Sequence, residues 1–311
     1  MTALAVAALF AITVVLVRQP AFVRPAAMKA RSDAARLRAH VQFLTTTARP
    51  RNADNPAQLR VAAAYIARSF RESGGLVEEQ ELTAHGHTYR NVLAYFGPRS
   101  AKRPLLVIGA HYDAFGAGAD LPGADDNASG TAGLLELARL LGQTPPKGSV
   151  VLVAFANEEP PYFGSELMGS AVHAASLENS GQPVAGMICL EMIGYFSGEQ
   201  QWNSWVLSLL LPNTSDFIGV GGGWRDRKLT RHVKVALNAA GANAVSFIGS
   251  RAMLDASDQR NYWARGWPAV IVTDTAYLRN PNYHTAQDTA ATLDYPRMAR
   301  IVDGVLLAVV N

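Results

Sequence analysis

Four short stretches of the chain consist almost entirely of apolar residues, at 105–110, 150–156, 185–193 and 269–273. Because polar residues do not alternate with the apolar ones, such runs are typical of strands covered on both faces. Two shorter strand-like stretches precede these runs, VEEQEL (77–82) and RNVLAYFG (90–97). Segments with helical apolar spacing separate or follow the apolar runs, at 128–142, 164–177, 226–240, 258–265 and 294–309. The alternation predicts an α/β fold in which a largely parallel sheet lies between layers of helices.

The composition supports a large core and argues against nucleic acid as a partner. Of 311 residues, 49% are hydrophobic and 17% are charged, which is enough apolar material for one large domain or two smaller ones. The net charge is +3, but the basic residues are scattered and the sequence contains no nucleic-acid-binding motif. The single cysteine, Cys189, excludes an internal disulfide and is predicted to be a core residue.

The N-terminal segment differs from the rest of the chain. Residues 4–17 are uncharged and apolar, and basic residues beginning with Arg18 follow them. This run falls just short of the ~20 residues that a membrane span needs and slightly exceeds a typical signal-peptide core. We expect residues 1–20 to be an uncleaved signal anchor, with a cleaved signal peptide or a buried core helix as alternatives. Residues 21–34 are then a linker, and residues 35–311 form one domain.

Such an anchor would attach the chain to a membrane. We therefore expect a membrane-anchored or exported protein whose domain lies outside the cytoplasm. The basic residues after the apolar run favour the opposite orientation, with the domain on the cytoplasmic side. The orientation stays open, and the sequence offers no evidence on the oligomeric state.

Polar side chains that resist burial follow or interrupt the predicted strands. In open α/β sheets, ligands bind beyond the carboxyl ends of the strands, so these side chains are candidates for a site. They are His111, Asp113, Asp125, Asp126, Asn127, Glu158, Glu159, Glu191, Asp274 and His284. Taken singly, each has an ordinary explanation, such as a helix cap for Asp125 or half of a buried ion pair for Glu191. Their shared position favours a common site.

The chemistry of these side chains indicates a metal. Imidazole and carboxylate donors without a thiolate suit zinc or a similar divalent ion. The adjacent carboxylates of Glu158 and Glu159 repel each other unless a cation or a proton lies between them. Two histidines and three carboxylates, one of which can bridge, are the ligand inventory of two ions ~3.5–4 Å apart. The sequence therefore predicts a two-metal hydrolase site, and it contains no Gly-x-Ser-x-Gly, His-Glu-x-x-His or P-loop motif.

At these residues the chain resembles the M28 family of zinc peptidases, which use co-catalytic zinc. The resemblance covers roughly residues 35 to 310 and rests on motifs in this order: GAHYD (109–113), GADDNASG (123–130), NEEPPYFGS (157–165), LEMIGYF (190–196) and RNPNYHTAQDT (279–289). It implies a single three-layer α/β domain of the zinc-exopeptidase, phosphorylase/hydrolase-like kind. The mixed, mostly parallel sheet is expected to have about eight strands.

The resemblance also implies a role for each site residue. It implies two Zn²⁺ ions per chain, one held by His111 and Glu191 and the other by Glu159 and His284. Asp126 corresponds to the residue that bridges them, because the bridging Asp of the family directly precedes an Asn-(Gly/Ala)-Ser step. The remaining two residues correspond to catalytic positions: Glu158 to the general base, and Asp113 to the acid that orients the ligand imidazole.

Two residues depart from the pattern of the family. Many members carry Asp where this chain has Glu191, which leaves the coordination geometry and metal preference open. Gln259 stands where relatives commonly have His in a Ser-Asp-His step, and this difference concerns the pocket wall rather than the metal.

The resemblance implies a metallo-exopeptidase acting on a peptide or small amide, and it favours an aminopeptidase. The alternatives are a glutaminyl-cyclase-like acyltransferase with a one-zinc site and a non-catalytic ectodomain of the same fold. Recognition of a substrate carboxylate stays open, since Arg279 is either solvated or a partner for that group. The irregular region 197–225, together with Tyr277, is a candidate lid that shapes an apolar pocket.

Overall fold

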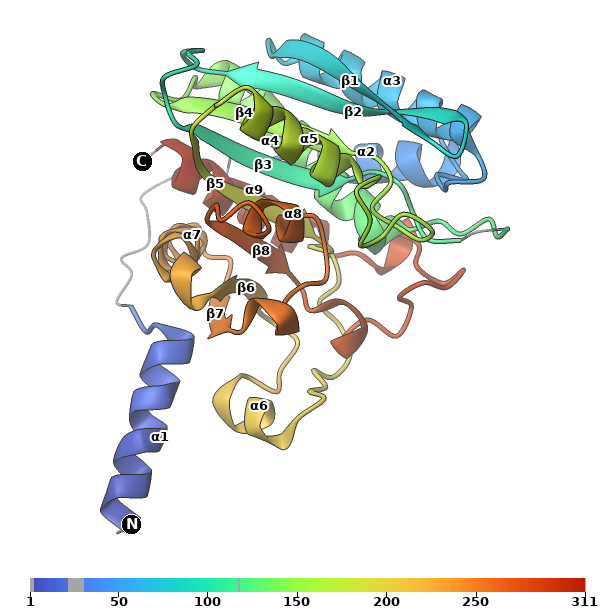
Figure 1. Cartoon of the computed structure of the whole chain (residues 1–311). Coiled ribbons are helices and arrows are strands. Elements are labelled where there is room, and N and C mark those ends of the chain that lie inside the picture. Colours follow the sequence, from blue (N-terminus) through green and yellow to red (C-terminus); the bar gives the residue numbers. More distant parts are fainter. Residues whose placement is uncertain (1–2, 22–30, 117, 311) are drawn as a thin grey trace.

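The computed structural model describes residues 3–21, 31–116 and 118–310. Its centre is an eight-stranded sheet with the strand order β1-β2-β4-β3-β5-β8-β6-β7 (Figure 1). The pairs β3/β4, β3/β5, β5/β8 and β6/β7 are parallel, whereas β1/β2, β2/β4 and β6/β8 are antiparallel. The strands are β1 (Leu76–Ala84), β2 (His87–Phe96), β3 (Leu105–His111), β4 (Ser149–Phe155), β5 (Val184–Glu191), β6 (Ile218–Gly223), β7 (Ala244–Gly249) and β8 (Ala269–Thr273).

Helices cover both faces of this sheet. The α-helices of the described residues are α1 (Ala3–Arg18), α2 (Ala34–Thr46), α3 (Pro56–Glu72), α4 (Gly130–Gln143), α5 (Gly169–Asn179), α6 (Trp205–Leu210), α7 (Arg227–Ala239), α8 (Gln259–Trp263) and α9 (Tyr295–Val310). One core packs α2, α3, α4, α7 and α9 against one face of the sheet, and a second core packs α5 and α8 against the other (Figure 1). The structure therefore confirms the predicted three-layer α/β fold with a mixed sheet of eight strands.

The central strands show why their sequences are apolar without alternation. In β3, Ile108 belongs to the first core and its neighbour Val107 to the second, because successive side chains point to opposite faces of a strand. Both residues are fully buried. Cys189 of β5 is likewise buried in the second core, which confirms its predicted role.

Two strands were not predicted from the sequence. β6 lies within the region 197–225, which was expected to be irregular, and β7 follows α7 where no element was expected. The segment IGVGGG has little strand propensity, but its glycines are required by packing. A Cβ on Gly219 would lie 2.4 Å from the ring of Phe247, and a Cβ on Gly221 would lie 2.9 Å from Ile271. These glycines admit neighbouring side chains, a reason that only the folded chain reveals.

The N-terminal apolar segment forms α1, whose last turn lies beside β7 and α6. Among the described residues, no helix is both long enough and apolar enough to span a membrane. The signal anchor at 1–20 and the extracytoplasmic location thus stay predictions. Most of the predicted linker 21–34, namely residues 22–30, lies outside the described residues, and α2 begins at Ala34 with Asp33 as its N-cap.

Acid should destabilise the fold through His173 of α5. Its Nδ1 lies 2.6 Å from the Tyr262 hydroxyl, and its Nε2 is buried without a partner. Burial lowers the pKa of His173 from 6.5 to about 4. Between these values the unfolded chain binds a proton that the folded chain does not, so stability is complete above about pH 6.5 and decreases below it. We expect the His173 contribution to reduce the free energy of unfolding by roughly 2 kcal/mol between about pH 6.5 and about pH 5.

Urea denaturation of chelator-treated protein at the two pH values measures this effect. His173→Gln should flatten the pH dependence, whereas His87→Gln, which changes an exposed histidine of β2, should not. Equal pH dependence in the wild type and His173→Gln would show that burial of His173 does not control acid sensitivity.

Candidate metal centre

The five predicted metal ligands meet at one edge of the sheet. β4, β3, β5 and β8 are parallel neighbours, so their carboxyl ends lie together. His111 ends β3, Glu159 follows β4, and Glu191 ends β5. Asp126 comes from the turn before α4, and His284 from the loop after β8. Residues separated by up to 158 positions of sequence, as Asp126 and His284 are, thereby come within the reach of one metal ion.

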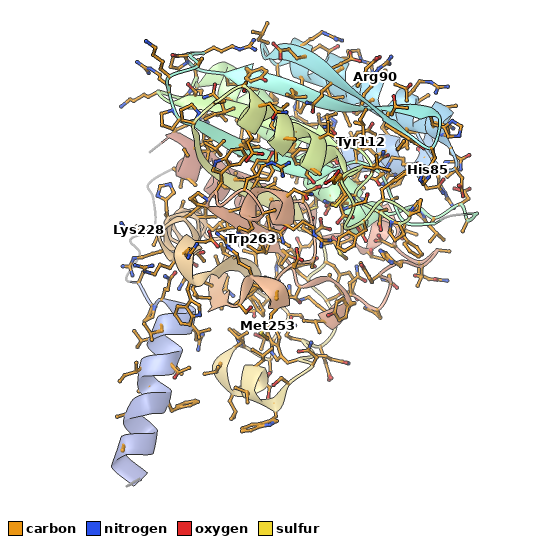
Figure 2. The ribbon with its side chains drawn as sticks, viewed as in Figure 1. His85, Arg90, Tyr112, Lys228, Met253 and Trp263 are labelled. Atoms are coloured by element: carbon orange, nitrogen blue, oxygen red, sulfur yellow. The ribbon has the colours of Figure 1, made fainter. Side chains whose placement is uncertain are left out.

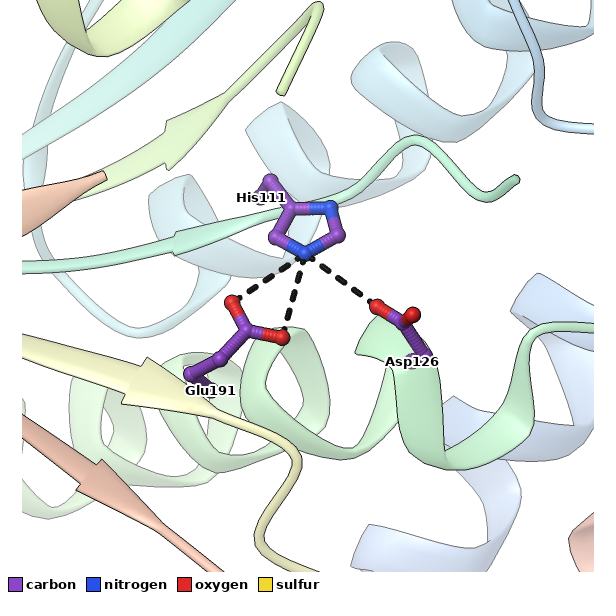
Figure 3. A group of neighbouring side chains, drawn as sticks. All are labelled: His111, Asp126 and Glu191. Carbon is purple, nitrogen blue, oxygen red and sulfur yellow. Dashed lines mark hydrogen bonds and ion pairs between the residues drawn. The ribbon is translucent and has the colours of Figure 1, made fainter. Parts of the chain in front are cut away.

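The first group of ligands consists of His111, Asp126 and Glu191 (Figure 3). The Nε2 atom of His111 lies 3.2 Å from Oε2 of Glu191 and 3.4 Å from Oδ1 of Asp126. All three side chains are buried. One imidazole nitrogen therefore points at two separate carboxylates.

The second group consists of Asp126, Glu159 and His284. The Nε2 atom of His284 lies 3.0 Å from Oδ2 of Asp126 and 3.4 Å from Oε1 of Glu159. Asp126 thus directs one carboxylate oxygen at each histidine. Glu158 belongs to neither group, although its Oε2 lies 3.8 Å from Nε2 of His111.

The donor atoms fit zinc in chemistry and in spacing. Zinc bonds of about 2.0–2.2 Å in a tetrahedral arrangement place ligand atoms roughly 3.3–3.6 Å apart. The separations between each histidine nitrogen and its carboxylate oxygens, from 3.0 to 3.4 Å, are close to this range. Furthermore, Oε1 of Glu159 and Nε2 of His284 are buried without a hydrogen-bond partner. Buried polar atoms are rarely left unpaired, so these two atoms suit a cation as their common partner.

The electrostatics of the cluster show how strongly it requires positive charge. Burial and the nearby Asp126 carboxylate raise the pKa of Glu159 to about 7, although His284 and His111 act in the opposite direction. Burial alone would lower the pKa of His284, but the close Asp126 and Glu159 carboxylates raise it to about 9. Protons therefore compensate the crowded carboxylates when no metal does. Because a metal must displace such protons, its affinity should increase with pH.

Asp113 fixes the loop that carries Glu158 and Glu159. Its carboxylate accepts the backbone N–H of Glu158 at 3.2 Å and that of Glu159 at 3.0 Å. Its Oδ1 also lies 3.5 Å from Nδ1 of His111, and its backbone oxygen lies 3.1 Å from the same nitrogen. The predicted orienting role is compatible with this geometry, and the grip on the loop is an additional role that the sequence did not indicate.

The supporting roles of two residues, Ser257 and Asp288, were not predicted, because no sequence pattern indicates them. The Ser257 hydroxyl donates to Oε2 of Glu191 at 2.6 Å. Asp288 accepts the backbone N–H of Asp125 at 2.9 Å and that of Asp126 at 3.1 Å. Ser257 belongs to the divergent Ser-Asp-Gln step and Asp288 to the motif of His284, so their positions were noticed but their roles were not.

Other candidates lie outside both groups. The Asp125 carboxylate accepts the N–H of Gly194 and the Asn280 amide, so it has a structural role beside Asp126. Asp274 accepts the backbone N–H of Tyr195 at 2.8 Å. These two carboxylates organise the loops that surround the metal groups.

Two further residues clarify the surroundings of the site. Gln259 is buried, and its amide donates to the carbonyl of Leu254. Leu254 lines an apolar cavity that also reaches Glu191. Arg279 is only 3% exposed, so the alternative of a solvated arginine is wrong. Its guanidinium donates to Gln200 and to the carbonyl of Phe217.

An apolar cavity of about 310 Å³ begins at Glu191 of the first group. Its wall includes residues of the predicted lid region and Tyr277, as expected from the sequence. Prominent among its lining residues are Trp202, Leu207, Phe247, Met253 and Ile271. Met253 lies on the side of the domain that faces α6 (Figure 2). The metal groups therefore adjoin a space suited to an apolar side chain.

Comparison with known proteins gives the family. The model of Peptidase family M28 matches residues 91–309, so the chain belongs to this family of peptidases. It is 47% identical over 285 residues to Uncharacterized protein YfbL of Escherichia coli K12, covering 87% of this chain and 86% of that protein. It is 28% identical over 250 residues to Leucine aminopeptidase 1 of Arthroderma otae, covering 78% of this chain and 62% of that protein. The chain thus spans less than two thirds of this second relative.

Solved structures show the same fold. BSAP, a zinc aminopeptidase from Bacillus subtilis, aligns with a TM-score of 0.70 at 16% identity, covering 91% of this chain and 95% of that chain. Glutaminyl cyclase from Bacteroides thetaiotaomicron aligns with a TM-score of 0.67 at 20% identity, covering 93% of this chain and 99% of that chain. Family membership confirms the expected class, a metallo-exopeptidase hydrolase. The fold alone does not separate a peptidase from a cyclase.

Asp113→Asn should weaken zinc binding without unfolding the protein. The amide keeps the shape of the side chain but places an NH₂ group against one of two backbone N–H donors, so the Glu158–Glu159 loop loses its anchor. Changes in residues that hold metal ligands typically cost 10–100-fold in affinity, and we expect roughly that loss here. Competition with a fluorescent zinc chelator measures it. Asp120→Asn, which alters an exposed carboxylate, is the control, and equal zinc affinity in both variants would contradict the anchoring role.

Proposed function

We propose that the chain is a two-zinc aminopeptidase that removes apolar residues from the N-termini of peptides. The observation that carries this proposal is the position of Asp126, whose two oxygens lie near His111 and His284 respectively. One zinc ion would be held by His111, Asp126 and Glu191, and the other by Asp126, Glu159 and His284. Bound there, zinc supplies Lewis-acid chemistry, which makes water more acidic and polarises a peptide carbonyl.

Glu158 is the proposed general base. It lies beside the first group without belonging to it, and it is buried. Burial, together with the Glu159 and Glu191 carboxylates, raises the pKa of Glu158 well above its usual value, although His111 acts in the opposite direction. A carboxylate with a raised pKa can take a proton from the attacking water. It then delivers that proton to the amine nitrogen as the C–N bond of the peptide breaks.

The surroundings of the metal groups favour recognition of an amine over that of a carboxylate. Buried carboxylates dominate the cluster and attract an N-terminal ammonium group. Arg279, the candidate partner for a substrate carboxylate, already donates to Gln200 and Phe217. The apolar cavity beside Glu191 suits the first side chain of the substrate. The name of the Arthroderma otae relative, leucine aminopeptidase, agrees with this substrate class.

A glutaminyl cyclase is the second candidate, because a cyclase shares the fold. The second ligand group of Asp126, Glu159 and His284 favours the peptidase, since a one-zinc site does not require it. Assays of aminoacyl-nitroanilides, free peptides and N-terminal Gln peptides, with and without chelator, distinguish the two. Chelator-sensitive release of apolar N-terminal residues supports the proposal. Cyclisation alone supports the cyclase, and inactivity on all substrates supports a non-catalytic protein.

Glu158→Gln should abolish most of the activity while both zinc ions stay bound. The amide cannot accept the proton of the attacking water, but Glu158 is not among the ligands. We expect kcat to decrease by roughly a hundred- to ten-thousand-fold. Steady-state assays of zinc-loaded protein, with elemental analysis of the same sample, measure both effects. Glu166→Gln changes an exposed carboxyl in the same loop and serves as control. Near-normal turnover in Glu158→Gln would refute the role of a base.

Asp126→Asn should remove both zinc ions together. An amide offers only one oxygen, so it cannot complete both ligand groups, which each depend on Asp126. Elemental analysis after dialysis should give well below one zinc ion per chain, compared with about two for the wild type and for Asp120→Asn. Two zinc ions retained in Asp126→Asn would exclude the bridge.

A further inference from the structure

The carboxyl end of α1 is fastened to the catalytic domain by buried polar groups. The Lys234 ammonium donates to the carbonyls of Arg18 and Gln19, and the Ser246 hydroxyl donates to that of Arg18 at 2.8 Å. Ser246 is fully buried and Lys234 is 7% exposed. A cation placed on the last carbonyls of a helix also interacts favourably with the helix dipole. Without α1, both side chains would lose these partners.

Apolar contacts continue this attachment along one face of the helix. Val14 and Val17, three residues apart on one face, pack against a small core formed by Leu210, Leu211, Phe217 and Val245. Trp202, Leu207 and Phe247 contact the same core. The opposite face of α1 is open, since Val15 is 54% exposed and Leu16 is 50% exposed. The helix therefore has a docked face and a free face.

The docked face reaches the cavity beside the metal centre. Val17 lines this cavity, which is also lined by Glu191 and by Leu207, Phe247 and Met253. α1 and α6 both project from the side of the domain where β7 lies, and Met253 lies on that side too (Figures 1 and 2). Because the cavity is only about 310 Å³, an additional large side chain at position 17 would occupy much of it.

We propose that α1 is a built-in wall of the substrate side-chain pocket and that Val17 helps to set the size of the side chain accepted. This inference rests on the proposed aminopeptidase function and extends it by naming the specificity residue. It also requires α1 to stay with the folded enzyme. Removal of the segment would open the pocket to solvent and leave Lys234 and Ser246 without their carbonyl partners.

Val17→Trp tests the wall by filling the cavity, and Val17→Ala tests it by enlarging the space. Val15→Trp is the matched control, because it places the same side chain on the free face of the same helix. In Val17→Trp we expect kcat/KM for leucyl- and phenylalanyl-p-nitroanilide to decrease by about tenfold relative to alanyl-p-nitroanilide. Val17→Ala should shift the preference towards phenylalanyl-p-nitroanilide. Unchanged ratios in both Val17 variants would overturn the proposal.

A binding measurement separates this inference from the proposed function. L-leucinol carries the amine and the apolar side chain but no hydrolysable bond, so calorimetry reports on the pocket without turnover. Weaker leucinol binding in Val17→Trp alone supports the wall even if no substrate is cleaved, in which case only the peptidase proposal fails. Equal leucinol binding in Val17→Trp and Val15→Trp overturns the wall even if the enzyme is an active aminopeptidase.

Docking of α1 is tested directly by cross-linking. Leu207→Cys is combined with Val17→Cys or, as control, with Val15→Cys, and each protein is treated with a short bismaleimide. Native Cys189 is buried and should not react. Preferential cross-linking from position 17 supports the docked helix. Equal cross-linking from both positions, or none, overturns it.

Discussion

Repulsion among buried carboxylates is the constraint around which this protein is built. Asp113, Asp126, Glu158, Glu159 and Glu191 all lie at one edge of the sheet with little exposure to water. Such groups are costly to bury unless protons, cations or N–H donors compensate them. The two histidines provide some compensation, since the carboxylates around them raise the pKa of both imidazoles. Divalent ions provide more, which explains why a metal centre suits this edge.

The rest of the site holds these charges against their repulsion. Backbone N–H groups bind the carboxylates of Asp113 and Asp288, and the Ser257 hydroxyl binds Glu191. Each of these bonds fixes a loop or a ligand in place before any ion arrives. The parallel pairing of β3, β4, β5 and β8 supplies the rigid base. The cavity beside Glu191 adds an apolar surface, next to which electrostatic interactions are stronger than in bulk water.

Much of the fold followed from the sequence, but the exceptions share a physical cause. The strands β3, β4, β5 and β8 were predicted because burial on both faces requires uninterrupted apolar residues. β6 was not predicted because its glycines have little strand propensity. They are required because the ring of Phe247, from the neighbouring strand, leaves no room for a Cβ. Arginine is usually a surface residue. Arg279 is nevertheless buried, because it makes tertiary contacts with Gln200 and Phe217. Pairwise contacts of this kind leave no periodic pattern in a sequence.

The sequence alone determined which donor atoms are available and that they follow apolar strands, because residue chemistry and hydrophobic periodicity are local properties. It therefore predicted the fold class and a metal-dependent hydrolase. The motif also favoured Asp126 over Asp125 as the bridging residue. Only the tertiary structure showed that the two carboxylate oxygens of Asp126 lie near different histidines, and that Asp113 holds the loop of Glu158. It also placed Val17 of the N-terminal helix in the cavity beside Glu191. These facts depend on distances between remote segments, which are set by packing of the whole chain.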